Sequence, residues 1–131
     1  MSEFRLQVVT PEGEKFDGMA QALHLRSSEG YVSIRAHHAD YVAALDVGVV
    51  TITAADEERK AACGGGFLSV QNGEARLVAT TFEYAEDIDA ARANLAKEKA
   101  EARIAAAKER AELNLARAKL ARALNRLKLT K

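Results

Sequence analysis

The sequence of 131 residues has a single cysteine, a single proline, no tryptophan and no long apolar run. Because Cys63 is alone, an intramolecular disulfide is excluded, and a reducing compartment fits this usage. No segment reaches the roughly 18 apolar residues that a membrane-spanning helix needs. The first residues also lack the basic-then-apolar pattern of a secretory signal. With 48% hydrophobic and 29% charged residues, the composition predicts a globular protein and excludes wholesale disorder.

Glycine, proline and aromatic residues are all missing from the last third of the chain. All eight glycines, the one proline and the seven aromatic residues (three Tyr and four Phe) precede residue 85. This break in composition predicts a domain boundary near residue 86. We therefore expect one domain over residues 1–86 and a C-terminal helical regulatory domain over residues 87–131.

The net charge is zero only as a sum of two unlike parts. Residues 1–86 carry 7 basic and 13 acidic side chains, which gives −6, whereas residues 87–131 carry 12 basic and 6 acidic ones, which gives +6. No acidic residue follows Glu112, so the whole positive excess lies in residues 113–131. Such asymmetry predicts that the two parts bind different partners, or each other.

The first part has the pattern of short β-strands. Phe4, Leu6 and Val8 alternate with polar neighbours, as in a strand with one buried face. Asn72-Gly73 separates two apolar runs, and this dipeptide strongly favours a tight hairpin because both residues tolerate positive φ. Short strands at this spacing predict an antiparallel sandwich or barrel.

The second part is rich in Ala, Leu, Lys, Arg and Glu and is predicted to be helical, with Asp87 and Asp89 near the start of the first helix as capping residues. One apolar stripe is expected in its second half and a thinner one upstream. The upstream stripe comprises Ile88, Ala91, Leu95 and Ala102, and the downstream stripe comprises Leu113, Ala116, Leu120, Ala123, Leu124 and Leu127. Two arrangements remain open: one helix about 63 Å long, or two antiparallel helices with a turn near residues 105–110.

The sequence offers no convincing catalytic or metal site. Gly64-Gly65-Gly66 is not followed by Lys-Ser/Thr as in a phosphate-binding loop, so we expect a β-bulge or a close backbone approach there. His37, His38 and Asp40 do not have the spacing of a metal site, and Cys63 is expected to be a small core residue. We therefore predict a protein that is not an enzyme by itself and holds no metal.

Several motifs occur in an order that resembles one protein family. They are Val8-Val9-Thr10-Pro11-Glu12-Gly13, Ser28-Glu29-Gly30, His38-Ala39-Asp40, Leu45-Asp46-Val47-Gly48, Gly65–Val70 and Ala85-Glu86-Asp87-Ile88-Asp89. Together they resemble the epsilon subunit of bacterial F-type ATP synthase over essentially the whole chain. The resemblance implies an α+β fold, with an N-terminal antiparallel β-sandwich of about ten strands and a C-terminal two-helix region that is folded as a hairpin or extended.

The same resemblance implies a function in the central stalk of the rotor, which couples proton or sodium-ion transport to ATP synthesis. Implied partners are the gamma subunit, the c-subunit ring and, when the helices extend, the catalytic alpha/beta subunits. Extended helices would inhibit ATP hydrolysis, and the basic tail would pair with acidic surfaces. The implied location is peripheral, on the cytoplasmic side of the bacterial cell membrane, with no nucleic-acid partner and no required cofactor.

The resemblance also implies a regulatory ATP site. Residues 88–93 match the family's ATP-binding motif Ile/Leu-Asp-x-x-Arg-Ala. The implied nucleotide-binding residues are Glu83, Ile88, Asp89, Arg92, Ala93, Lys99, Arg122 and Arg126. Arginine can bind phosphate in a bidentate geometry, whereas Lys99, which stands where the tighter-binding members have arginine, keeps the charge but not that geometry.

Alternative functions are also compatible with these residues. Asp89 and Arg92 are placed to form a helix cap and an i,i+3 ion pair without any ligand. The protein would then be a structural rotor subunit that does not bind nucleotide. A nucleic-acid-binding module using the basic helix is a third alternative, against which stand the missing aromatics and the acidic first part.

Overall fold

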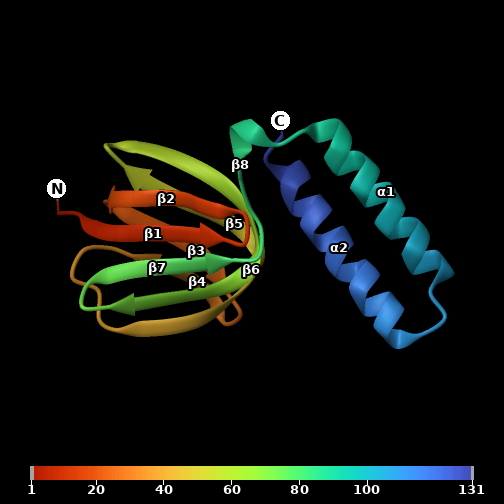
Figure 1. The fold of residues 1–131 in the computed structure, drawn as a ribbon, viewed down its shortest axis with the longest axis horizontal. Helices are drawn as coiled ribbons and strands as arrows, with labels where there is room; N and C mark the ends of the chain where they lie inside the picture. Colours follow the sequence, from red (N-terminus) through yellow and green to blue (C-terminus); the bar gives the residue numbers. More distant parts are fainter. Residues whose placement is uncertain (1, 131) are drawn as a thin grey trace.

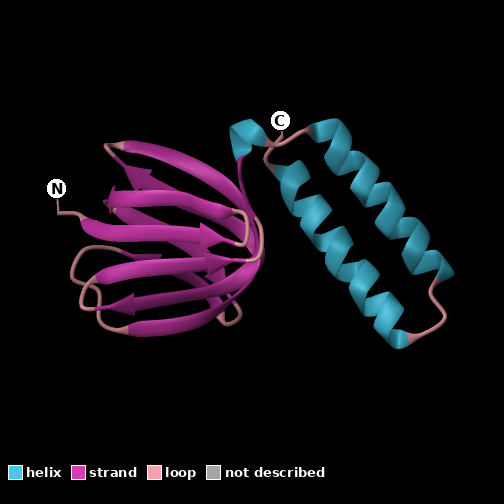
Figure 2. Ribbon diagram, in the orientation of Figure 1, coloured by secondary structure: helices cyan, strands magenta, loops and turns pink. Residues whose placement is uncertain are grey.

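The computed structural model describes residues 2–130, so Met1 and Lys131, the outer ends of the two expected domains, lie outside the described residues. Eight strands are followed by two antiparallel helices, which confirms the predicted α+β class (Figures 1 and 2). The elements are β1 (Phe4–Thr10), β2 (Gly13–Ala20), β3 (Ala22–Ser27), β4 (Gly30–Ile34), β5 (Tyr41–Ala54), β6 (Glu57–Gln71), β7 (Glu74–Ala79), β8 (Phe82–Tyr84), the 3-10 helix η1 (Ala85–Asp87), α1 (Ala90–Ala106) and α2 (Arg110–Lys128). In the described part of the chain, no helix is long and apolar enough to cross a bilayer.

The strands form a sandwich in which two long strands serve both layers (Figure 1). The order is β2-β1-β7-β6-β5-β3-β4, with β8 paired to β6. The second half of β6 pairs with β7 and the first half with β8, whereas β5 pairs with β6 along nearly its whole length. Eight strands suffice where about ten were expected, because β5 and β6 continue from one layer into the other. One pairing, β1 with β7, is parallel.

Glycines allow β6 to bend between the layers. Gly65 and Gly66 have φ values of 103° and 142°, which L side chains rarely adopt. A Cβ on Gly66 would lie 1.9 Å from the Val78 carbonyl oxygen, and one on Gly64 would lie 2.1 Å from the Thr81 hydroxyl. The predicted close backbone approach at this glycine run is therefore confirmed.

Three other local predictions in the sandwich agree with the structure: the tight turn at Asn72-Gly73, the alternation along β1 and the burial of Cys63. Asn72 and Gly73, with φ values of 52° and 76°, form the tight turn between β6 and β7. Alternate residues of β1, starting with Phe4, are buried as their pattern predicted. Cys63 is a core residue, and burial raises the pKa of its thiol. Among residues 2–130, no three His, Cys, Asp or Glu side chains form a group that can hold a metal ion.

The helices form a hairpin in which the loop over residues 107–109 reverses the chain, so the one-helix alternative is wrong for this structure. Leu113, Ala116, Leu120, Ala123 and Leu127 are at least partly buried, as the downstream stripe predicted, but Leu124 is 41% exposed. The upstream stripe is wrong for three of its four residues, since Ala91, Leu95 and Ala102 are exposed and only Ile88 is partly buried. Instead Ala93 and Ala100 are buried, because small side chains let two helices approach closely.

The hairpin contacts the sandwich through α2, and α1 packs on the outer side of α2 (Figure 1). Asn125 on α2 is only 4% exposed. Its Nδ2 donates to the Gly48 carbonyl oxygen at 2.8 Å and, at 3.5 Å, to that of Cys63. One buried amide thus connects α2 to both long strands.

Candidate functional site

Two adjoining cavities lie where α1, α2 and the end of the sandwich meet. The first has a volume of about 500 Å³ and the second about 330 Å³, within the range of small-molecule sites. Thr81, Ala96 and Arg126 line both cavities, so the two are neighbours. Segments far apart in the sequence therefore contribute to one region.

The first cavity contains most of the residues of the ATP-binding motif. It is lined by Glu12, Lys15, Thr81, Glu83, Asp87, Ile88, Asp89, Arg92, Ala93, Ala96 and Arg126. Four of these are acidic and three are basic. Carboxylates can accept hydrogen bonds from ribose hydroxyls or an exocyclic amine, and the arginines can bind an anion. Ala93, which is 3% exposed, places only a methyl side chain at this part of α1.

Asp89 begins α1 rather than pairing with the arginine one turn later. It is the N-cap residue, and its Oδ1 accepts from the Arg92 backbone N–H at 3.1 Å. The capping prediction is confirmed for Asp89. The side-chain ion pair between Asp89 and Arg92 does not occur among the ion pairs of the described residues. The Arg92 side chain is exposed at the cavity and is left for other interactions.

A partly exposed ion pair connects the last strand to α2. Arg126 Nε donates to Glu83 Oε1 at 2.5 Å, which joins β8 to the C-terminal helix across the first cavity. The adjoining linker is fixed separately. Arg59 donates to Glu86 at 2.6 Å and lies 3.6 Å above the centre of the Tyr84 ring. This contact lowers the pKa of the Glu86 carboxyl, while burial raises the pKa of Tyr84.

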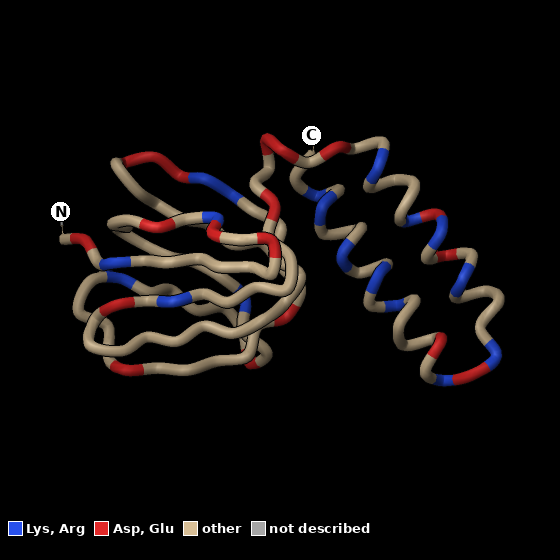
Figure 3. The backbone as a smooth tube through the Cα atoms, in the orientation of Figure 1, with Lys and Arg blue, Asp and Glu red and all other residues tan. Residues whose placement is uncertain are grey.

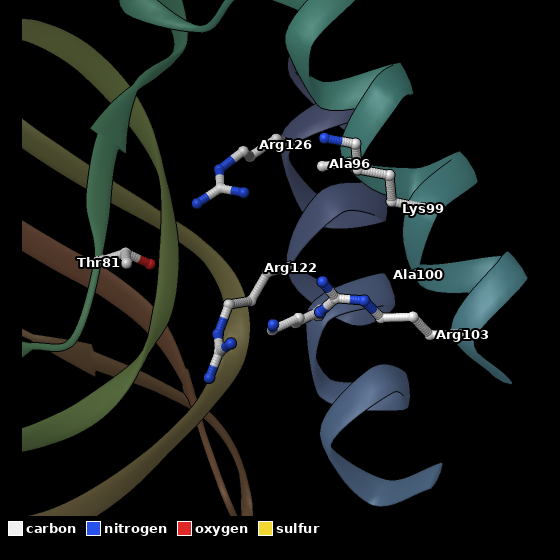
Figure 4. Close-up of a pocket in the computed structure, with 8 residues that line it drawn as sticks. Thr81, Ala96, Lys99, Ala100, Arg103, Arg122 and Arg126 are labelled. Carbon is white, nitrogen blue, oxygen red and sulfur yellow. The ribbon is translucent and has the colours of Figure 1, made fainter. Parts of the chain in front are cut away.

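The second cavity has a different electrostatic character. It is lined by Thr81, Ala96, Lys99, Ala100, Arg103, Lys119, Arg122 and Arg126, seven of which are labelled in Figure 4. Five of the eight are basic and none is acidic. In Figure 4, the side chains of Arg122 and Arg126 extend from α2 towards Thr81 on the sandwich side. The lining therefore presents positive charge from both helices, and Figure 3 shows the same concentration of basic residues along the hairpin.

Arg122 has a polar atom without a partner. Its Nε is buried and makes no hydrogen bond. Around it, Ala62, Cys63, Gly64, Asn125 and Arg126 pack so closely that no space for a water molecule remains. A buried donor without an acceptor is costly, and the close packing leaves no room for a ligand atom to supply one.

All eight residues implied for nucleotide binding line the two cavities, although Lys99 and Arg122 are on the second and not the first. Sequence reasoning missed Glu12, Lys15, Thr81, Arg103 and Lys119. Helical spacing offered a signal for two of these, because Arg103 follows Lys99 by four residues and Lys119 precedes Arg122 by three. No local signal identified Glu12, Lys15 or Thr81, which tertiary structure alone brings to the helices.

Comparisons with known proteins agree over the entire length of the chain. Residues 3–85 match the family described as ATP synthase, Delta/Epsilon chain, beta-sandwich domain, and residues 86–131 match its long alpha-helix domain. The ATP synthase epsilon chain of Caldicellulosiruptor bescii is 39% identical over 131 residues, which cover 100% of this chain and 96% of that protein. That of Alkaliphilus metalliredigens is 40% identical over 130 residues, or 99% and 97% of the two chains.

A solved structure has the same fold at lower identity. A chain in the cryo-EM structure of the Euglena gracilis mitochondrial ATP synthase, OSCP/F1/c-ring, aligns with a TM-score of 0.78 and 19% identity, covering 92% of this chain and 77% of that one. At 19% identity, this comparison shows only that the two chains share a fold. The two matched domains and the curated relatives carry the assignment: this chain belongs to the epsilon-chain family of bacterial F-type ATP synthase.

Proposed function

We propose that this non-catalytic central-stalk subunit regulates ATP hydrolysis by its complex, with ATP as the ligand that holds the helical hairpin folded. The observation that carries the proposal is the pair of cavities between the helices and the sandwich, which all eight residues implied for nucleotide binding line. Mixed charges in the first cavity suit the adenosine part, and the basic second cavity suits the phosphates. No hydrolysis of this nucleotide is proposed.

The folded hairpin brings like charges together, so a bound anion can stabilise it. Lys99 on α1 lines the same cavity as Lys119 and Arg122 on α2. Such charges repel one another, although solvent weakens the interaction. A bound polyanion would neutralise them and favour the hairpin, since a ligand stabilises the state that binds it better. When ATP is absent, the helices would extend towards the alpha/beta subunits.

Replacing Arg92 by alanine is expected to weaken ATP binding about tenfold, as for loss of one charge-assisted hydrogen bond. Isothermal titration of the full chain measures the dissociation constant. Arg117→Ala is the matched control, because Arg117 is exposed on α2 outside both cavities. Equal, negligible affinity in wild type and Arg92→Ala would instead favour the structural rotor subunit without nucleotide.

Spectroscopic labels at residues 94 and 124, both on exposed helical positions, report the distance between α1 and α2 with and without ATP. Each is introduced as a cysteine, while the native Cys63 thiol is buried. A short distance with ATP that lengthens when ATP is removed supports the switch. One unchanged distance under both conditions contradicts regulation even if ATP binds.

The proposed stalk partner is the gamma subunit, and an exposed apolar surface on the sandwich supports this. Val42, Phe67 and Val78 are 74%, 56% and 37% exposed. Phe67 is paired with Val78 on β7 and with Ala44 on β5, so these residues lie on one outer face of neighbouring strands. Exposed apolar groups in contiguous rows are typical of protein interfaces. The c-subunit ring is the second proposed partner, which would keep the subunit at the cytoplasmic membrane surface.

Replacing Phe67 by serine is expected to weaken binding to purified gamma subunit about tenfold or more, because aromatic anchors dominate such interfaces. Surface plasmon resonance gives the affinity. Tyr31→Ser is the control, since Tyr31 is 74% exposed on β4, which β5 and β3 separate from β6 in the sheet. Equal losses for the two variants would show that the surface around Phe67 is not the gamma-binding face.

A further inference from the structure

The last residue of β8 fixes the chain firmly to the sandwich. Tyr84 is 7% exposed and pairs with Ala61 on β6. Its hydroxyl donates to the Lys15 carbonyl oxygen on β2 at 2.8 Å. Its ring packs edge-on against Phe82, with 5.3 Å between the ring centres. Three separate contacts thus hold the chain at Tyr84 before the helical part begins.

Arg59 on β6 extends this attachment beyond the last strand. Its guanidinium lies 3.6 Å above the centre of the Tyr84 ring and donates to Glu86 in η1 at 2.6 Å. An exposed ion pair contributes little by itself, but here the aromatic ring also orients the guanidinium through a cation–π contact. The hydrogen bond from Arg59 lowers the pKa of the Glu86 carboxyl, so this carboxylate stays charged at neutral pH. We call Arg59, Tyr84 and Glu86 the linker clasp.

The chain is much less constrained between the linker clasp and α1. Ile88 and Asp89 have extended backbone, with ψ values of 126° and 107°, and form the loop that joins η1 to α1 in Figure 2. The Asp89 carboxylate accepts from the Arg92 N–H inside the same helix, so this cap moves with α1. The helix α1 packs mainly on α2. Ile88 and Asp89 are therefore the place where the chain passes from the sandwich to the hairpin.

We propose that Ile88 and Asp89 are the hinge about which the helical hairpin leaves the sandwich, and that the linker clasp keeps η1 on the sandwich while it does so. This inference rests on the proposed movement of the helices and adds where the chain bends. Hinges are commonly a few residues at the ends of elements that absorb large changes in backbone angles. Arg59 and Glu86 are positioning residues, because they hold the fixed end from which both helices swing.

The test measures two distances in the full chain by pulsed electron paramagnetic resonance, with spin labels on introduced cysteines. The linker pair, Glu74→Cys with Asp87→Cys, reports whether η1 stays on the sandwich. The hairpin pair, Glu74→Cys with Glu101→Cys, reports whether α1 moves. All three side chains are exposed, whereas the native Cys63 is buried. Glu101 lies about 18 Å from Asp89 along α1, so a swing of about 60° would move it by about 18 Å.

Each pair is measured with ATP, without ATP, and in Asn125→Asp. This substitution removes the buried donor to the Gly48 and Cys63 carbonyl oxygens and is expected to release α2 whether or not nucleotide is bound. The hairpin pair should lengthen or broaden without ATP and in Asn125→Asp. The linker pair should keep one narrow distance in all three samples, because the linker clasp does not depend on the helices.

The linker clasp is tested in the released protein. Adding Arg59→Gln to Asn125→Asp should broaden the distance of the linker pair, because η1 then loses its contact with β6. Lys60→Gln is the matched control, since Lys60 is the exposed neighbour of Arg59 and forms no ion pair among the described residues. Equal broadening by the two substitutions would show that Arg59 does not hold the linker.

The outcomes separate the hinge from the proposed switch. If the linker pair broadens together with the hairpin pair, the hinge at Ile88 and Asp89 is overturned, while a response to ATP still supports the switch. If the hairpin pair responds to Asn125→Asp but not to ATP, the ATP switch fails and the hinge stands. If the hairpin pair is unchanged in all three samples, the helices do not leave the sandwich and both proposals are overturned.

Discussion

Replacing Gly66 by alanine is expected to lower the free energy of unfolding by about 4 kcal/mol, the combined cost of overpacking and backbone strain. The new Cβ would lie 1.9 Å from the Val78 carbonyl oxygen and 2.9 Å from the Ala79 Cα. Both obstacles are backbone atoms of the paired strand, so no side-chain rotation relieves the clash. A φ of 142° adds strain for any L residue. Urea unfolding followed by far-UV circular dichroism measures the loss.

Gly73→Ala separates the two causes. Gly73 also has positive φ, at 76°, but a Cβ there would meet nothing within 4 Å. Strain alone should cost about 1–2 kcal/mol. If the two variants lose the same stability, close approach between β6 and β7 is not what requires glycine at position 66. A larger loss for Gly66→Ala identifies the bend of β6 as the constraint.

Replacing Asn125 by aspartate is expected to detach α2 from the sandwich, with a cost to docking of about 3 kcal/mol. The amide donates to the carbonyl oxygens of Gly48 and Cys63 in a buried contact. A carboxylate would place negative charge against the same oxygens and offer no donor. Hydrogen exchange measured by mass spectrometry should show loss of protection in α2, while the sandwich strands keep theirs.

Asn114→Asp is the matched control for this substitution. Asn114 lies on the same helix, and its replacement by aspartate changes the charge by the same amount, but its side chain is exposed. Equal protection of α2 in the two variants would contradict a docking function for Asn125. Because Asn125 lies between Arg122 and Arg126, detachment should also weaken ATP binding. Apparent affinity falls with the fraction of molecules in the binding-competent state.

The helical hairpin illustrates what the sequence did not reveal. Leu95 lies in an apolar stripe by helical periodicity, yet it is 51% exposed. Ala93 and Ala100 are buried in its place, because the spacing between α1 and α2 favours the face with small side chains. Hydrophobic periodicity weights residues by their apolarity and carries no information on how closely a partner helix approaches.

The sandwich shows the opposite case. Its turn at Asn72-Gly73 and the bend at Gly64–Gly66 depend on φ values that particular residues tolerate, and alternation along β1 predicted which side chains are buried. These are local properties, so residues adjacent in the chain are sufficient to predict them. The number of strands was harder to predict from the sequence, because whether a bend ends a strand depends on the neighbouring strands.

The sequence by itself determined the class of fold, the change from strands to helices near residue 86, and the division of charge between them. It also identified, through family resemblance, eight residues that line the two cavities. Only the tertiary structure decided that the helices form a hairpin, that Asn125 anchors it, and that Thr81, Arg103 and Lys119 share one cavity. The physical reason is range: φ preferences and periodicity act between neighbours, whereas a cavity exists only where segments distant in the chain pack together.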